Sequence, residues 1–209
     1  QPIVDLESEA VVGFEALTRF HDGARPDVRY AEALKGGLGT EYELATIRAA
    51  LEFGTRLPDH VFISINVSPE FVLHGDRRFR ELLKGATRPL VLELTEHVPI
   101  DDYRRVRTAL RKLGDVGLAV DDAGAGYASL RHILELRPTY AKLDISLVHG
   151  IDGDDLRQAL AAGLQYFASK TGCRLIAEGV ESRAEADVLT RLGIRFGQGD
   201  LFGRPELAA

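Results

Sequence analysis

The sequence predicts an α/β fold, namely a closed (β/α)8 barrel with one antiparallel strand near the N-terminus. Eight short apolar segments with strand character alternate with segments of helical periodicity, and this alternation is typical of a parallel sheet. The 209 residues and 45% hydrophobic content suffice for one large core, and single α/β barrels occur near this length. We therefore interpret residues 1–209 as one barrel domain, with an open doubly wound sheet as the alternative.

The reversed strand is predicted at the start of the chain. Two apolar runs, residues 2–6 and 11–17, are separated by only four residues. A crossover between parallel strands needs about a dozen residues or more, whereas antiparallel strands can be joined by a short turn. The two runs should therefore form an antiparallel hairpin.

The remaining elements follow from periodicity and from turn and capping residues. Strands are predicted at residues 61–67, 90–95, 118–120, in the run that ends at 142–144, at 174–177 and at 194–196. Helices are predicted at 41–57, from Pro69 onward, at 101–113, around 130–134, at 154–171 and from 182 to about 193. The helix over 154–171 has apolar side chains three or four apart, namely Leu156, Leu160, Leu164 and Phe167. Gly172 should stop that helix, and Ser182 with Glu185 should form a capping box for the next one.

Composition narrows the functional classes. The net charge of −6 and the isoelectric point of about 5.6 argue against a non-specific binder of nucleic-acid polymers or membrane surfaces. The single cysteine, Cys173, excludes an intrachain disulfide and a cysteine zinc site; it fits a reducing compartment and is expected to be buried and inert. Without a signal peptide or a membrane-spanning run, the domain is expected to be cytoplasmic. The start at Gln1 and the absence of methionine indicate a fragment of a longer, multidomain protein, which leaves room for a membrane anchor elsewhere.

Several common catalytic motifs are missing. No G-x-G-x-x-G follows the first strand, so a dinucleotide-binding Rossmann domain is disfavoured. The segment GAGYAS at Gly124 lacks the Lys-Ser/Thr ending of a phosphate-binding P-loop. There is no G-x-S-x-G elbow and no Cys–His pairing, and the six histidines show no metal-ligand spacing.

Acidic and amide side chains recur where the predicted strands end. In a barrel these ends meet on one face, where active sites are built. The residues at or just past the strand ends are Glu15, Asn66, Glu93, Asp121, Asp122, Lys142, Asp144, Glu178, Glu181 and Gln198. So many carboxylates would be costly without cations, and oxygen ligands favour Mg²⁺ or Mn²⁺ over Zn²⁺. Two such ions are typical of phosphoryl or phosphodiester hydrolysis, in which Lys142 would orient the attacking water or offset negative charge.

The adjacent Asp121 and Asp122 also allow a simpler interpretation. Two neighbouring carboxylates repel each other unless a cation lies between them or each has its own partner. Taken alone, the pair is explained by Asp121 capping the following helix and Asp122 facing solvent. The metal interpretation depends on the spacing of the whole set.

Seven motifs occur in order along nearly the whole chain. They are EAL (15–17) with Arg19, INVSP (65–69), ELTE (93–96), DDAGAGYASL (121–130), KLD (142–144), AEGVES (177–182) and QGDLFGRP (198–205). Together they closely resemble the EAL-domain family of cyclic-di-GMP phosphodiesterases. The resemblance implies a TIM-like barrel with an antiparallel strand. It also implies hydrolysis of cyclic di-GMP to linear pGpG with two Mg²⁺ or Mn²⁺ ions, Ca²⁺ being inhibitory.

The resemblance implies a role for each motif residue. One metal would be held by Glu15, Asn66, Glu93 and Asp121, and the second by Asp121, Asp122 and Glu178. Lys142 would hold the catalytic water, supported by Glu181. Leu17 and Arg19 would contact the substrate, supported by Asp144 and Gln198. Glu96 would anchor the glycine-rich loop after Asp122.

The chain also departs from the family pattern. The family usually has DDFGTGYSSL, whereas this chain has Ala123, Ala125 and Ala128; it also has Asp200 where a larger residue is usual, and the stretch 21–42 is short. None of these changes removes a predicted ligand. Because Ala123 lacks a ring and Ala125 lacks a hydroxyl, we expect a looser loop that holds the second metal less firmly. The alternative is that neighbouring residues have repacked around the alanines.

Three functional hypotheses follow. The first is an active phosphodiesterase, the second a non-catalytic cyclic-di-GMP receptor, and the third a structural or dimerisation barrel without a ligand. Because every predicted metal ligand is present, the sequence favours the enzyme. The resemblance further implies a homodimer and N-terminal regulatory domains outside this chain.

Overall fold

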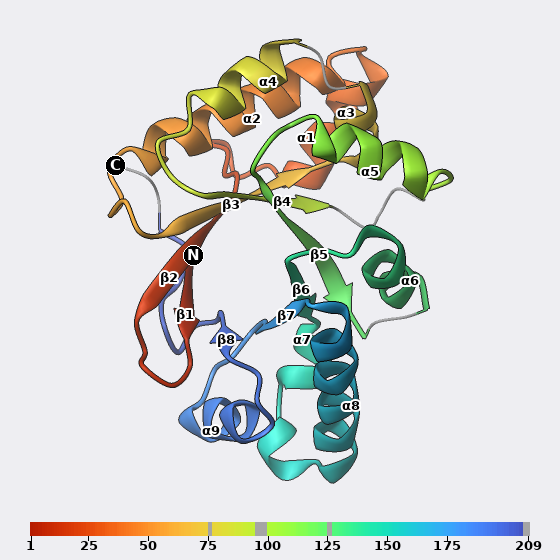
Figure 1. Cartoon of the computed structure of the whole chain (residues 1–209). Coiled ribbons are helices and arrows are strands. Elements are labelled where there is room, and N and C mark those ends of the chain that lie inside the picture. The colour runs from red at the N-terminus through yellow and green to blue at the C-terminus, as the bar shows by residue number, and fades with distance from the viewer. Residues whose placement is uncertain (75–76, 95–99, 125–126, 207–209) are drawn as a thin grey trace.

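The computed structural model describes the chain except for residues 75–76, 95–99, 125–126 and 207–209 and the side chains of residues 127–129. Its strands close into a barrel whose order follows the sequence, which confirms the barrel over the open sheet (Figure 1). The strands are β1 (Pro2–Asp5), β2 (Val11–Ala16), β3 (Phe62–Val67), β4 (Leu90–Leu94), β5 (Gly117–Ala123), β6 (Tyr140–Leu143), β7 (Arg174–Ala177) and β8 (Phe196–Gly197).

The reversed strand is β1, which runs antiparallel to both of its neighbours, β2 and β8, whereas the other adjacent strands are parallel. Asp5 closes the hairpin, because its Oδ1 accepts hydrogen bonds from the backbone N–H groups of Glu7 and Ser8, both at 3.1 Å. Its Oδ2 pairs with Arg195 Nε at 2.5 Å and so ties the hairpin to the segment before β8. The prediction from the short connection is confirmed.

Helices cover the outside of the barrel (Figure 1). They are α1 (Pro26–Lys35), α2 (Gly39–Gly54), α3 (Pro69–His74), α4 (Arg77–Lys84), α5 (Tyr103–Arg111), α6 (Tyr127–Leu136), α7 (Ile145–Val148), the 3-10 helix η1 (Ile151–Gly153), α8 (Asp155–Thr171) and α9 (Arg183–Arg191). Within the described ranges, no helix has both the length and the apolar character needed to cross a membrane.

Two predicted helix ends are confirmed, whereas α2 ends at Gly54 instead of residue 57, and the helices α1 and α7 were not predicted. Gly172 ends α8 with a φ of 76°, and Ser182 and Glu185 form the capping box of α9. The sequence analysis did not predict α1, in which Val28, Ala31 and Leu34 are three residues apart but no residue is buried. In α8, Leu156 is 82% exposed, and the buried residues are Ala161, Leu164 and Ala168. The small alanine side chains face the barrel, which turns the first leucines outward.

Alternation along the strands divides the barrel interior into two layers. At one end the inward side chains are apolar and pack together; they are Ile3, Phe62, Val91, Ala119, Tyr140, Ile176 and Phe196. Two positions further along the parallel strands stand polar residues, namely Ser64, Glu93, Asp121, Lys142, Glu178 and Gln198. The residues between them pack outward in the larger core beneath the helices. We call the first set, the inward apolar side chains, the apolar plug. Because side chains alternate with a period of two, the strands that form this plug also carry the polar layer at their carboxyl ends.

The one cysteine belongs to the outer core. Cys173 is buried just before β7, and burial raises the pKa of its thiol to about 11. A thiol that remains protonated at neutral pH is a poor nucleophile, so the prediction of a buried, unreactive cysteine agrees with the structure.

The first altered residue of the glycine-rich loop is well packed. Ala123 lies in β5 opposite Leu143 and is fully buried. Gly124 follows with a φ of 101°, and the side chains of Leu147 and Leu164 lie where a side chain at position 124 would point. At Ala123 the structure therefore agrees with repacking and not with the expected loose loop. Ala125 lies outside the described residues.

Restoring the larger side chain should destabilise this protein. We expect Ala123→Phe to lower the free energy of unfolding by about 1–3 kcal/mol, because a ring added to a filled core forces its neighbours to move. Thermal unfolding of the parent and the variant measures the effect, and Ala33→Phe on α1, which has no buried residues, is the control. An unchanged or higher melting temperature for Ala123→Phe would show unfilled space at this position.

Candidate functional site

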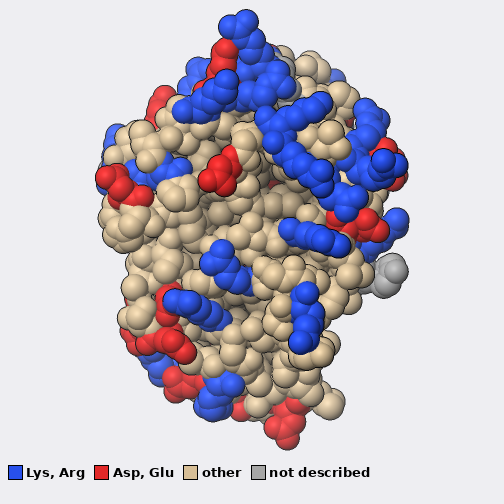
Figure 2. Space-filling model, in the orientation of Figure 1, with Lys and Arg blue, Asp and Glu red and all other residues tan. Residues whose placement is uncertain are grey.

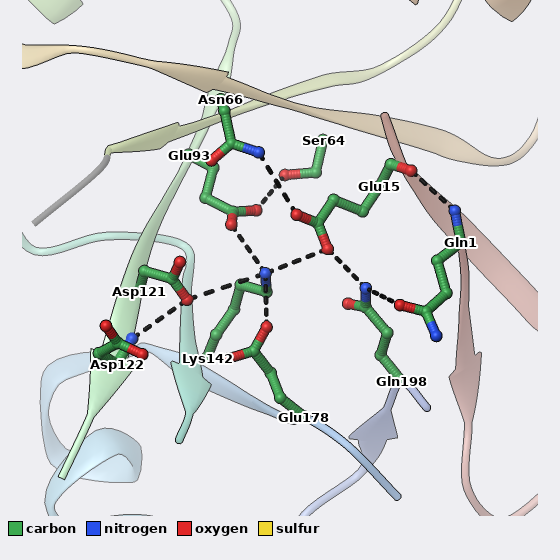
Figure 3. A network of polar contacts seen from close by, with 10 residues as sticks. All are labelled: Gln1, Glu15, Ser64, Asn66, Glu93, Asp121, Asp122, Lys142, Glu178 and Gln198. Carbon is green, nitrogen blue, oxygen red and sulfur yellow. Dashed lines mark hydrogen bonds and ion pairs between the residues drawn. The ribbon is translucent and has the colours of Figure 1, made fainter. Parts of the chain in front are cut away.

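Lys142 lies at the centre of the polar layer (Figure 3). Its ammonium Nζ is 2.7 Å from Glu93 Oε1, 2.7 Å from Glu178 Oε1, 3.2 Å from Glu15 Oε2 and 3.8 Å from Asp121 Oδ1. Lys142 and Glu93 are only 2% and 1% exposed. One buried cation on β6 therefore faces four carboxylates, which lie on β2, β4 and β5 and just after β7.

Burial and the neighbouring charges shift the pKa values of Lys142 and of the carboxyls around it. Burial raises the pKa of Glu93 and of Glu178 to about 8, although Lys142 opposes the change. Burial would lower the pKa of Lys142, but the surrounding carboxylates raise it well above its ordinary value. Burial also acts to raise the pKa of Glu15, yet Lys142 and hydrogen bonds from Gln198 and Asn66 hold it below its ordinary value. Near neutral pH, the raised pKa values favour the protonated forms of Glu93 and Glu178, which reduces the net negative charge of the group.

Glu15 is held by the amide side chains predicted beside it. Gln198 Nε2 donates to Glu15 Oε2 at 2.5 Å, and Asn66 Nδ2 donates to Glu15 Oε1 at 3.3 Å. Gln198 Nε2 also donates to Gln1 Oε1 at 3.0 Å, while the buried Gln198 Oε1 accepts no hydrogen bond from the described part of the chain. The site thus contains an unpaired oxygen acceptor beside its carboxylates.

Asp121, Asp122 and Glu178 meet directly. Each offers a carboxylate oxygen, and the three atoms lie within 4.8 Å of one another. Successive strand residues normally point to opposite faces. Asp122 departs from this rule because its φ is 54°, and its N–H donates to Asp121 Oδ1 at 3.1 Å. A left-handed aspartate is energetically costly, and here it brings two adjacent carboxylates to one side.

The donor chemistry of this layer fits hard divalent cations. The candidate ligands are carboxylate and amide oxygens, which Mg²⁺, Mn²⁺ and Ca²⁺ prefer. The raised pKa values of Glu93 and Glu178 reflect more negative charge than Lys142 offsets, and the Gln198 oxygen adds an available acceptor beside these carboxylates. A divalent ion would offset that charge without a change of fold.

Two supporting groups were not identified from the sequence. Ser64 Oγ donates to Glu93 Oε2 at 2.9 Å, and its inward position two residues after Phe62 is the signal that could have found it. Glu43 on α2 is buried and accepts from Ser68 N at 2.9 Å, from Ser68 Oγ at 2.7 Å and from Tyr30 Oη at 2.8 Å. Because Ser68 follows β3 by one residue, this contact fixes the strand end that carries Asn66. A carboxylate in the middle of a helix gave no signal of that role.

Several predicted residues lie apart from the Lys142 network. The side chain of Glu181 is 56% exposed and contacts His149 at 3.9 Å. Arg19 is exposed and donates to the carbonyl oxygen of Thr18 at 2.9 Å, and Leu17 is half-buried. Glu96 lies outside the described residues.

Asp144 has a local structural role. It caps α7 by accepting from Ser146 N at 2.9 Å. Burial acts to raise the pKa of Asp144, but hydrogen bonds from Ser146 and Asp122 hold it below its ordinary value. The contact with Asp122 places Asp144 beside the carboxylate cluster, and Lys142 pairs with other carboxylates instead.

Comparison with known proteins identifies the family. A family model described as "EAL domain" matches residues 1–205. The chain belongs to the EAL domain family. This EAL domain is 31% identical to the probable cyclic di-GMP phosphodiesterase PdeD of Escherichia coli, over 98% of the chain and 40% of that protein. It is 32% identical to the cyclic di-GMP phosphodiesterase TpdA of Vibrio parahaemolyticus, over 95% of the chain and 35% of that protein. The EAL domain thus spans less than half of each relative.

A solved structure of the same fold is that of BlrP1 from Klebsiella pneumoniae. Its calcium and cyclic-di-GMP complex superposes with a TM-score of 0.86 at 32% identity, covering 100% of this chain and 55% of that chain. Its manganese and cyclic-di-GMP complex at pH 6 gives a TM-score of 0.87 at 30% identity, with the same coverage. The TIM-like barrel implied by the motifs is therefore confirmed.

Removing the central ammonium should destabilise the metal-free EAL domain. We expect Lys142→Met to cost on the order of 3 kcal/mol, the lower end of the range for a broken buried ion pair, because Glu93 and Glu178 can take up protons. Mg²⁺ or Mn²⁺ should then stabilise the variant more than the parent. Thermal unfolding in chelator and in metal measures both effects, with the exposed Lys35→Met as control. Equal melting temperatures for Lys142→Met and the parent in chelator would contradict the proposed charge balance.

The raised pKa values predict a pH dependence. A carboxyl whose pKa is higher in the folded state stabilises the protein below its unfolded pKa, and that stability is lost as the pH rises through the folded pKa. For Glu93 and Glu178 the loss extends from their ordinary pKa of 4.5 up to about pH 8, above which both carboxyls are ionised in the folded and the unfolded state alike. The metal-free protein should therefore lose stability between about pH 5 and pH 8, and metal affinity should rise over the same range as ligand protons are released.

Melting curves across this pH range, in chelator and in metal, test the dependence. Glu178→Gln is the matched variant, because it removes one of the two titrations and should reduce the slope. The quantity to compare is the loss of melting temperature from the lower to the upper end of the pH range. The expectation fails if this loss is no larger for the metal-free parent than for Glu178→Gln.

Proposed function

We propose that this EAL domain hydrolyses cyclic di-GMP to linear pGpG. The proposal rests on the buried carboxylates around Lys142, which adjoin the Asp121, Asp122 and Glu178 cluster. The relatives PdeD and TpdA carry the name of this activity, and BlrP1 was solved with cyclic di-GMP and a divalent cation. These carboxylates are the ligand type that metal-dependent hydrolysis requires.

We further propose two divalent cations, Mg²⁺ or Mn²⁺, in this layer. Glu15, Asn66, Glu93 and Asp121 would hold one, and Asp121, Asp122 and Glu178 would hold the other. When bound, such cations activate water and stabilise the charge that develops on the phosphodiester. Ca²⁺ should occupy the site with little turnover, because its looser coordination positions the reacting groups less well.

Lys142 would position water and offset charge. Its raised pKa keeps the ammonium protonated at neutral pH, so it cannot accept the proton of the attacking water. It can donate a hydrogen bond to that oxygen and stabilise negative charge on the phosphate. We assign Asp122, Glu181 and Glu96 to supporting catalytic roles.

Residues beside the strand ends would bind the substrate. Arg19 is exposed just past β2 and carries a charge complementary to phosphate, and Leu17 lies between Arg19 and the metal ligand Glu15 in the sequence. Gln198, which touches Glu15, and Asp144, which touches Asp122, would support this side of the site.

The decisive experiment is direct. The protein is incubated with cyclic di-GMP and Mg²⁺ or Mn²⁺, and pGpG is detected by chromatography. We expect pGpG with either metal, little with Ca²⁺ and none in excess chelator. Full activity in chelator would contradict the metal proposal, whereas tight binding of cyclic di-GMP without any pGpG would identify a receptor.

Two substitutions separate metal binding from chemistry. Glu15→Gln and Lys142→Met should each lower kcat by at least about a hundredfold, because each removes charge at the reacting centre. Lys142→Met should leave metal-dependent binding of cyclic di-GMP within about threefold of the parent, since it removes no proposed ligand. The exposed Glu52→Gln is the control. Parent-like turnover of either site variant would refute the role given to that residue.

We also propose that the domain forms a homodimer and that regulatory domains precede it in a longer protein. Exposed apolar side chains on α8, Leu156 and Leu160, support the dimer, since such residues usually mark contact surfaces when they cluster. Light scattering should give twice the chain mass for the parent and a monomer for Leu156→Lys with Leu160→Lys. A monomeric parent at all accessible concentrations would refute this proposal.

A further inference from the structure

A pocket lies on the outer wall of the barrel, between α3, α4 and α5. We call it the α4–α5 pocket, and its charged lining consists of Arg80, Arg104, Arg105, Lys112 and Asp102. Its volume is about 500 Å³, which falls within the range of about 300–1,000 Å³ that is usual for small-molecule sites. None of these residues belongs to the Lys142 network.

The charge of this pocket originates in an unusual helix. The ten residues 103–112 contain five basic side chains and no acidic one. Tyr103 and Val106 are buried against the core, and the stripe that includes Arg104, Arg105 and Lys112 lines the pocket. Figure 2 shows Lys and Arg gathered over the upper part of the molecule, where Figure 1 draws α4 and α5. Arg104, Arg105 and Lys112 thus place positive charge along one face of α5 and its C-terminal end.

Two neighbouring arginines have a carboxylate partner, whereas the basic residues of the pocket have none in the described ranges. Arg77 pairs with Glu81 at 2.6 Å and Arg78 with Glu41 at 3.0 Å. In the described ranges Arg80, Arg104, Arg105 and Lys112 form no ion pair. The one acid in the lining, Asp102, caps α5 by accepting from Arg105 N at 3.0 Å. The chain as a whole has a net charge of −6, so this concentration of positive charge is local.

We propose that the α4–α5 pocket binds a compact polyphosphate, either inorganic or carried by a nucleoside. Guanidinium groups match phosphate oxygens in a forked geometry, and four cations exceed what one phosphate group would need. The cations come from both sides of a concave site, Arg80 from α4 and the others from α5 and its C-terminal end. A chain of two or three adjacent phosphates fits both the charge and the size of the pocket.

Larger anions fit less well. A nucleic acid needs basic residues along an extended track, and the negative charge of the rest of the surface would repel it. An anionic membrane requires charges that protrude from a flat or convex face, whereas Arg80 and Arg105 surround a hollow. Nucleic acid and anionic membrane are therefore included in the test as alternative ligands.

The test is a calorimetric titration with tripolyphosphate in excess chelator, so that the carboxylate site remains free of metal and repels the anion. We expect saturable binding at one site per chain that weakens as salt is raised. Arg104→Gln with Arg105→Gln should weaken binding by at least about tenfold, and Arg80→Gln on the opposite helix should also weaken it. Arg111→Gln, on the same helix but outside the lining, is the matched control and should change the affinity by less than about twofold.

A second variant keeps the charge and fills the space. Thr108→Trp places a large side chain in the lining and should abolish binding although every basic residue remains. Circular dichroism melts show that each variant is folded before it is titrated. Equal affinity for GTP and tripolyphosphate assigns the phosphate chain as the ligand, and tighter binding of GTP assigns a nucleotide.

The proposal is overturned by three results. One is the absence of saturable binding to the folded parent. Another is an equal loss of tripolyphosphate affinity in Arg111→Gln and in the double variant Arg104→Gln with Arg105→Gln, which indicates non-specific electrostatic attraction. The third is tighter binding to anionic vesicles, duplex DNA or a poly-glutamate peptide than to either polyphosphate.

Discussion

The ammonium of Lys142, buried among the carboxylates of Glu15, Glu93, Asp121 and Glu178, sets the charge balance of the barrel interior. Desolvated carboxylates are stable only when cations or protons offset their charge. One lysine cannot offset four acids, so the remainder is met by protons or by divalent cations. Because a protonated carboxyl is a poor metal ligand, protons and divalent cations compete for these side chains. The pH therefore affects both the stability of the domain and its affinity for metal.

The position of this layer was predictable because strand geometry is regular. In a parallel barrel the carboxyl ends converge, so Glu93, Asp121, Lys142 and Glu178, spread over more than eighty residues of sequence, had to meet. The same regularity places an apolar residue two positions before each of them, and this apolar plug holds the strands whose ends carry the charges. The amino-terminal half of each of these strands thus contributes to the apolar packing, and the carboxyl end carries the polar side chain of the candidate site.

The unpredicted features lie where that regularity ends. Loop residues such as Glu181 have no fixed direction relative to the strands, so their distance to the site could not be derived from spacing. α1 lacks a buried face, and α8 packs through alanines, so hydrophobic periodicity missed the first and misplaced the contact face of the second. The support that Glu43 gives to Ser68 depends on a tertiary contact, for which a mid-helix glutamate offers no local signal.

The pairing of β1 with β8 has a consequence for how the domain is made. The first strand of the chain remains an open edge until Phe196 and Gly197 arrive to close the barrel. Closure therefore joins residues that are nearly the whole chain apart, a long-range step of the kind that folds slowly. Until β8 pairs, Glu15 remains accessible to water on this side, and Gln198, which donates to Glu15 Oε2, then encloses it. The interior is enclosed only when β8 pairs with β1, so the cost of burying its charges falls on this one step.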